Sequence, residues 1–193
     1  MSLDKKAEEA LSRLADRAKA LSGTYFRSVE YRDMDPTSVL SGRGTELYGG
    51  RFASIGTRAV YVSDSDRTAS EEVTARKERL GGKAQISLEK YPRIVFAVNV
   101  QLERHISFLK KPRDRILEAL WKSSLDEDNL GASQVVGAFF HRLGIQGILF
   151  PSVVIQGTNL IAFVANCAGG SLQIVNLDEL TRKIKEITRV LPK

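Results

Sequence analysis

Apolar residues recur every three to four positions in several stretches of the chain, and this spacing is typical of amphipathic helices. Residues 3–21 carry one such stripe of leucines and alanines, and Gly23 follows it as a helix stop. A second stripe near the end of the chain indicates another helix, and its members are Leu177, Leu180, Ile184, Ile187 and Leu191. Further helices are predicted at 67–80, from Pro112 through "RDRILEALW", and at 132–143.

Shorter runs of alternating or continuous apolar residues lie between these helices and predict strands. The run "RIVFAVNVQL" at 93–102 is β-branched and almost continuously apolar, which favours a central strand. Strands are also predicted at 24–30, 59–63, 146–150 and 160–165, with polar loops at 31–50 and 122–129. Because no repeat, low-complexity tract or linker divides the 193 residues, the pattern predicts a single α+β domain.

Two neighbouring glutamates in the helix predicted at 67–80 are separated by helix geometry. At about 100° per residue, Glu71 lies opposite the apolar stripe of that helix, whereas Glu72 lies on the edge of the stripe. The sequence therefore predicts that Glu71 faces water and that Glu72 faces a cleft.

Composition excludes several classes of protein. No apolar run approaches the eighteen residues of a membrane span, and acids and bases interrupt the first twenty-one residues, unlike a secretory signal. The single cysteine, Cys167, cannot form an internal disulfide, so we expect a cytoplasmic protein. His105 and His141 are far apart with no acid at ligand spacing, so we expect no metal site.

The formal net charge of +6 indicates an anionic partner, either a nucleic acid, a phosphorylated ligand or an acidic protein. The densest basic stretch, "LKKPRDR" at 109–115, lies in no aromatic stacking platform of the kind that binds nucleic acids. Arg27 falls in the middle of the strand 24–30, on one face with Tyr25 and Val29. A guanidinium buried there requires a carboxylate or a phosphate, so a structural ion pair and an anion site both stay open.

Three motifs follow one another over residues 24–165: "YFRSVE", then "YGGRFASIGTRAVYVSDSDRTASEEV", then "GIQGILFPSVVIQGTNLIAF". In this order they resemble the RES domain, a family named for an arginine, a glutamate and a serine. Matched motif by motif, these three residues are Arg27, Glu72 and Ser152. Members of the family are toxins of bacterial toxin–antitoxin pairs of the RES–Xre type.

The resemblance implies a fold like that of ADP-ribosyltransferases, with a mixed β-sheet core surrounded by helices. It also implies an NAD substrate whose nicotinamide–ribose bond is cleaved, with water, phosphate or a protein as the acceptor of ADP-ribose. No metal is implied. The predicted catalytic residues are Glu72, Arg27 and Ser152, and the predicted NAD-binding residues are Arg51, Tyr61 and Gly50.

The resemblance divides the chain into an N-terminal helix at 1–23, a RES-like NAD-binding catalytic core at 24–165, and a C-terminal helical extension at 166–193. It implies a cognate helix-turn-helix antitoxin as partner, with nucleic acid bound only indirectly through that antitoxin. The helix at 177–191 must bury its stripe either on its own domain, for instance against helix 3–21, or across a subunit interface. We expect a homodimer that uses one or both terminal helices.

Two other functions stay open. The basic composition also suits an RNA- or DNA-binding or cleaving protein. A catalytically inactive RES-like interaction protein is the other, because Ala53 and Ser54 stand where the family has an asparagine after the aromatic residue of its glycine motif.

Overall fold

The computed structural model describes residues 3–79, 93–126 and 130–190, and within them six strands form one mixed sheet. The strands are β1 (Lys19–Glu30), β2 (Ala59–Ser63), β3 (Arg93–Ser107), β4 (Gly147–Pro151), β5 (Thr158–Phe163) and β6 (Leu172–Ile174). The α-helices are α1 (Lys5–Ala15), α2 (Arg43–Tyr48), α3 (Asp66–Arg79), α5 (Arg115–Leu125), α6 (Leu130–Arg142) and α7 (Leu177–Val190). No helix in the described ranges is long and apolar enough to cross a membrane.

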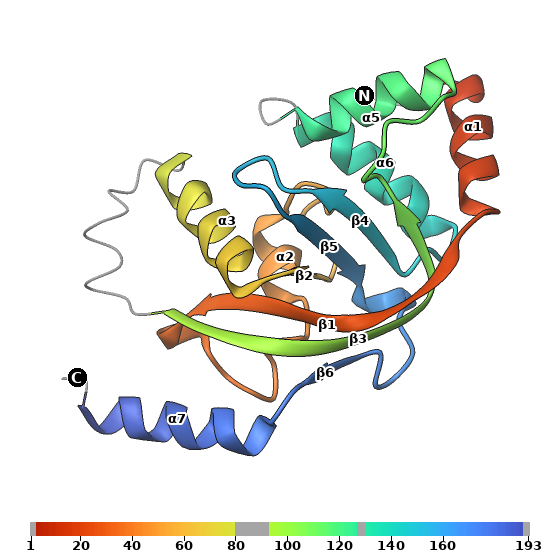
Figure 1. Cartoon of the computed structure of the whole chain (residues 1–193). Helices are drawn as coiled ribbons and strands as arrows, with labels where there is room; N and C mark the ends of the chain where they lie inside the picture. Colours follow the sequence, from red (N-terminus) through yellow and green to blue (C-terminus); the bar gives the residue numbers. More distant parts are fainter. Residues whose placement is uncertain (1–2, 80–92, 127–129, 191–193) are drawn as a thin grey trace.

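Five of these strands pair in a closed ring, in the order β1, β2, β5, β4, β3 and back to β1. Only the pairing of β3 with β4 is parallel within the described sheet, and β6 joins β3 on its outer side. β1 and β3 run together along most of their length, from Lys19 opposite His105 to Glu30 opposite Arg93. In Figure 1 the long β1–β3 ribbon therefore lies across the shorter strands β2, β5 and β4 as a second layer.

The alternation of side chains along β2 divides the apolar interior into two clusters. Val60 and Val62 point into the cluster between the two layers of strands, where they meet Phe96 and Val98 of β3. Ala59 and Tyr61 point to the opposite cluster, which α1, α5 and α6 cover. Each fully buried Val, Leu or Phe contributes about 1.5–3 kcal/mol relative to an exposed one, so β2 anchors both clusters.

The helix predicted at 3–21 is shorter in the structure. Asp4 caps its start by accepting a hydrogen bond from the Ala7 amide at 2.8 Å, and α1 ends at Ala15. The prediction was wrong for the second half of the segment, because β1 already begins at Lys19 and pairs with β3 there. A strand partner supplied by a distant segment outweighs local helix propensity.

Other differences lie at the ends of elements. The loop predicted at 122–129 is wrong for its first residues, because α5 continues to Leu125, while residues 127–129 lie outside the described ranges. The central strand extends to Ser107 rather than ending at 102, and the strand predicted at 160–165 gives way to a 3₁₀ turn after Phe163. The sequence pattern predicted neither the short helix α2 nor the strand β6.

The C-terminal helix α7 packs on its own domain through Leu180 and Ile184, which contact the cluster between the strand layers. It does not pack against α1, which belongs to the other cluster and lies at the opposite end of the molecule in Figure 1. Leu177, at the start of the stripe, is 45% exposed. Leu191 lies outside the described ranges. The homodimer stays a prediction.

Gly137 of α6 offers a test of how closely this helix approaches the loop at 49–53 that follows α2, called the glycine loop below. A Cβ atom added there would collide with the backbone carbonyl of Phe52, which is fully buried and cannot move aside easily. We expect Gly137→Ala to lower the free energy of unfolding by about 1–3 kcal/mol, measured by urea denaturation.

The matched control is Gly44→Ala in α2, where an added Cβ meets nothing within 4 Å. That variant gains helix propensity and is expected to be unchanged or up to about 1 kcal/mol more stable. Equal stability of the two variants would contradict the proposed close packing of α6 on the loop.

Candidate functional site

Glu72 projects from the middle of α3 toward the ends of β4 and β5. Ser65 caps the start of α3, because its hydroxyl accepts a hydrogen bond from the Thr68 amide at 3.0 Å. Glu71 is exposed and Glu72 is half-buried, as the helical geometry predicted. Arg93 of β3 connects the same helix to the sheet, because it donates to the Thr74 hydroxyl at 2.8 Å and to the Ser70 carbonyl at 3.3 Å.

Two donors from distant parts of the chain meet one oxygen of Glu72. The Ser152 hydroxyl and the Asn159 side-chain amide each donate to Oε1 at 2.6 Å. Ser152 follows β4, and its Oγ also accepts from the amides of Val154 and Ile155, both at 3.2 Å. The structure therefore brings Glu72 and Ser152 together, as the motif assignment requires.

Asn159 is held in turn by Ser63 at the end of β2. The two residues lie opposite each other in the β2–β5 pairing, and the Ser63 hydroxyl donates to Oδ1 of Asn159 at 2.7 Å. Both residues are buried. Sequence reasoning missed them, because their contact depends on the pairing of β2 with β5, which brings together residues almost a hundred positions apart.

Arg27 projects from the middle of β1 toward β2, where its Nη1 donates to the Tyr61 carbonyl at 2.8 Å. Its Nε is buried and has no acceptor among the described residues. Burial lowers the pKa of the guanidinium to about 10, because removal from water disfavours the charged form. The cation is thus fixed by a backbone carbonyl rather than by a carboxylate.

Tyr25 shares this face of β1 and lies near Asp64, which follows β2. Burial raises the pKa of the Tyr25 phenol above its usual value, and the negative charge of Asp64 raises it further. Both effects favour the neutral form of the phenol.

Tyr61 connects the glycine loop to the sheet. Its hydroxyl accepts a hydrogen bond from the Phe52 amide at 3.1 Å, and its ring packs edge-on against Phe150. A Cβ at Gly50 would lie 2.6 Å from this hydroxyl, so only glycine allows the loop to approach the ring. The Gly50 carbonyl accepts from the Gln134 side chain at 3.1 Å, which fastens the loop to α6.

Arg51 is half-buried beside this loop, and its Nη1 donates to the Ser124 carbonyl of α5 at 3.2 Å. The loop reaches this position after Gly49, whose φ of 65° and ψ of −173° are accessible in practice only to glycine. The Arg51 side chain therefore bonds to α5, whereas the Arg27 side chain bonds to β2. Both roles in ligand binding stay predictions.

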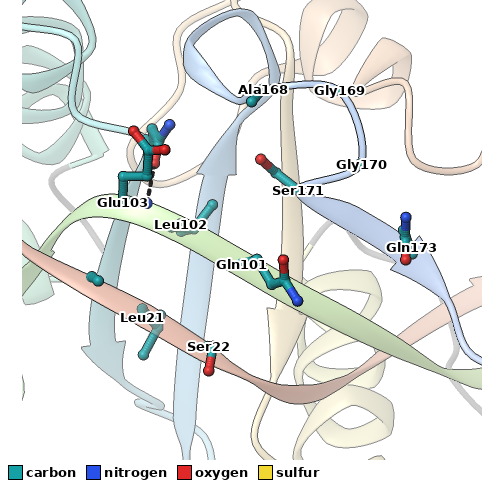
Figure 2. A pocket seen from close by; sticks show the side chains of 12 residues that line it. Leu21, Ser22, Gln101, Leu102, Glu103, Ala168, Gly169, Gly170, Ser171 and Gln173 are labelled. Atoms are coloured by element: carbon teal, nitrogen blue, oxygen red, sulfur yellow. Dashed lines mark hydrogen bonds between the residues drawn. The ribbon is translucent and has the colours of Figure 1, made fainter.

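The strand β2 links the predicted residues to one another. Its Tyr61 contacts Arg27 and the Gly50 loop, and its Ser63 contacts Asn159, which holds Glu72 beside Ser152. A separate hollow of about 600 Å³ lies between the start of β1, the middle of β3 and the segment before β6 (Figure 2). None of the predicted site residues lines it, and its wall combines neutral polar side chains such as Gln101 and Gln173 with apolar residues and glycines.

Within the described residues, no three histidine, cysteine or acidic side chains gather to hold a metal ion. Cys167 lies after β5, and burial raises the pKa of its thiol to about 11. A thiol in that state is a poor nucleophile.

The comparison with protein families confirms the resemblance. The model of the RES domain matches residues 17–182, so the chain belongs to the RES domain family. No curated protein matches the chain.

Among solved structures, the chain is similar to one in the crystal structure of the M. tuberculosis MbcT–MbcA toxin–antitoxin complex, with a TM-score of 0.75 and 22% sequence identity. The match covers 96% of this chain and all of the other, and it confirms the predicted α+β fold.

Cys167 allows a test of its own environment. Its pKa rises from 9.0 to about 11 in the folded protein, so at pH 7.5 the reactive thiolate is roughly 100-fold rarer than in the unfolded chain. We expect alkylation by iodoacetamide, followed by mass spectrometry, to be slower by at least that factor in the native protein, and to accelerate about tenfold per pH unit up to about pH 10. Equal rates in buffer and in urea would contradict the assignment.

Proposed function

We propose that the protein is the toxin of a bacterial toxin–antitoxin pair and that it consumes NAD at the site formed by Glu72 and Arg27. Membership in the RES domain family and the fold shared with a chain of a toxin–antitoxin complex support the class of protein. The observation that carries the chemistry is the carboxylate of Glu72, which two donors hold on one oxygen. Arg27 bonds to β2, the strand whose Ser63 holds one of these donors, Asn159.

The proposed reaction breaks the bond between the nicotinamide nitrogen and C1′ of the ribose. The bonding electron pair leaves with nicotinamide, which becomes neutral, and positive charge develops on the ribose. An oxygen of water, phosphate or a protein side chain then bonds to C1′, and an acceptor that carries a proton releases it to solvent. A fixed negative charge lowers the energy of the cationic transition state, and Glu72 supplies that charge.

The two arginines suit the anionic part of the substrate. The buried Nε of Arg27 lacks an acceptor among the described residues, and a phosphate oxygen is a suitable acceptor for it. Arg51 adds a second guanidinium beside the glycine loop. Arg27 and Arg51 would hold the pyrophosphate or a ribose hydroxyl, while Gly50 and Tyr61 shape the wall beside them.

The proposed partner is a cognate helix-turn-helix antitoxin that blocks the site, with nucleic acid contacted only through that protein. The formal charge of +6 favours an acidic surface on such a partner. A cytoplasmic location and a homodimer complete the proposal.

The reaction is tested by incubating the purified protein with NAD, with and without phosphate, and identifying the products by mass spectrometry. We expect Glu72→Gln to slow NAD loss by roughly 10²–10³-fold, because one electrostatic contact in the transition state is removed. Glu71→Gln is the matched control on the same helix, and its exposed side chain predicts an unchanged rate.

Equal rates for the two glutamine variants would refute the assignment of Glu72. Intact NAD in every reaction of the wild-type protein would refute the proposed activity itself. The basic nucleic-acid-binding and inactive-scaffold alternatives would then be favoured.

The binding roles of the arginines are tested in a Glu72→Gln background, so that NAD persists during isothermal titration. We expect Arg27→Lys and Arg51→Lys each to weaken binding by roughly 10- to 100-fold, since losing a charged hydrogen bond costs about 1.5–3 kcal/mol and lysine cannot restore a bidentate contact. Arg58→Lys is the control, because Arg58 is exposed and pairs with Glu46 at 3.0 Å. Unchanged affinity in both test variants would assign them purely structural roles.

A further inference from the structure

We infer that Asn159 is a positioning residue that fixes Glu72 through Oε1 and leaves Oε2 to face the substrate. The inference deepens the proposed function and rests on it. Its basis is the chain of contacts from Ser63 through Asn159 to Glu72, in which each group has one permitted hydrogen-bonding role.

The orientation of the Asn159 amide follows from the chemistry of its neighbours. An ionised carboxylate can only accept hydrogen bonds, so the NH₂ end of the amide must face Glu72. The carbonyl end then faces Ser63, whose hydroxyl has to donate. Because Asn159 and Ser63 are both more than 90% buried, no bulk water competes for these atoms, and a flipped amide would place two acceptors against each other.

Ser152, the other donor to Glu72, also has a fixed hydrogen-bonding role. Ser152 uses its hydroxyl proton on Oε1 and receives the amides of Val154 and Ile155 on its oxygen, so its hydrogen-bonding capacity is filled. Both donors act on Oε1, and Oε2 accepts no hydrogen bond from any described residue. The carboxylate is therefore held at one end and open at the other.

This arrangement separates positioning from chemistry. A glutamate on a helix has three rotatable side-chain bonds, and a displacement of about 1 Å at a reacting centre costs up to roughly 10²-fold in rate. Asn159, on the rigid strand β5, removes that freedom without touching the substrate. Ser63 bonds to Asn159 and influences the position of Glu72 only through that residue.

The decisive experiment compares kcat and KM for NAD consumption in Asn159→Ala and Asn159→Asp. We expect kcat to fall by roughly 10- to 100-fold in both, with KM within about twofold of the wild type. Asp has the shape of Asn but cannot donate when ionised, and it sets a second negative charge against Oε1.

The matched control is Asn166→Ala, which removes an asparagine amide that donates to the carbonyls of His141 and Ile145, at 2.8 Å each. We expect kcat and KM to stay unchanged there, even if thermal stability falls. Asn159→Asp with wild-type kcat would overturn the inference. So would an increase confined to KM, since that would make Asn159 a ligand contact.

Ser63 gives a second test through a double-substitution cycle. Ser63→Ala is expected to lower kcat by a few-fold in the wild type, and to have no further effect once Asn159 is alanine. Equal effects in both backgrounds would mean that Ser63 acts independently of Asn159.

If the wild-type protein leaves NAD intact, the proposed function is refuted, but the contact between Asn159 and Glu72 can still be tested. A second double-substitution cycle, which measures stability instead of activity, does this. The thermal midpoint is measured for Asn159→Ala, Glu72→Gln and the double variant. We expect the double variant to lose clearly less than the sum of the two single shifts, because each substitution breaks the same contact. Strictly additive shifts would show that Asn159 does not hold Glu72.

Discussion

A carboxylate can leave bulk water at low cost only when donors replace the water that it loses. Glu72 meets this requirement through Ser152 and Asn159, and the surrounding structure is arranged to bring both donors to it. The turn after β4 closes where the Ser152 amide donates to the Gly157 carbonyl at 2.9 Å. Thr68 of α3 packs so closely on Gly157 that a side chain there would collide with it. α3, the turn and β5 therefore form one unit whose geometry sets the position of the glutamate.

The strand β2 joins this unit to the cation. β1 meets β2 in the sheet at the pair Phe26–Ser63, and the bond from Arg27 to the Tyr61 carbonyl adds a side-chain link beside that pair. Two residues of β2 thus contact both ends of the site, while Val60 and Val62 anchor the strand in the core. A change in the packing of β2 would shift the carboxylate and the guanidinium together. The closed ring of strands explains how a small domain keeps two opposite charges at a fixed separation.

The sequence allowed the parts of this arrangement that depend on local periodicity to be predicted. The contrast between Glu71 and Glu72 follows from 100° per residue, and the strand at 59–63 follows from its alternation. The start of β1 could not be predicted, because Lys19–Leu21 continue a helical stripe and become a strand only through pairing with β3, some eighty positions away. Asn159 and Ser63 could not be predicted from the sequence for the same reason. Their importance depends on the β2–β5 register, which no local pattern contains.

Arg27 and Arg93 separate two uses of a buried arginine that the sequence left open. Arg93 lies opposite Glu30 in the β1–β3 pairing, and although burial lowers the pKa of Arg93, the charge of Glu30 opposes that effect, while Nε and Nη2 of Arg93 are buried without a hydrogen-bond partner among the described residues. For Arg27 burial acts on the pKa without such a carboxylate, and Nε stays unsatisfied among the described residues. An unpaired buried guanidinium nitrogen destabilises the folded state in both residues, and Arg27 differs in that no carboxylate offsets the burial of its charge. Such local violations concentrate where a ligand supplies the missing partner. A phosphate oxygen meets the hydrogen-bonding and the charge requirement of Arg27 at once, which connects the energetics of the fold to the proposed dinucleotide substrate.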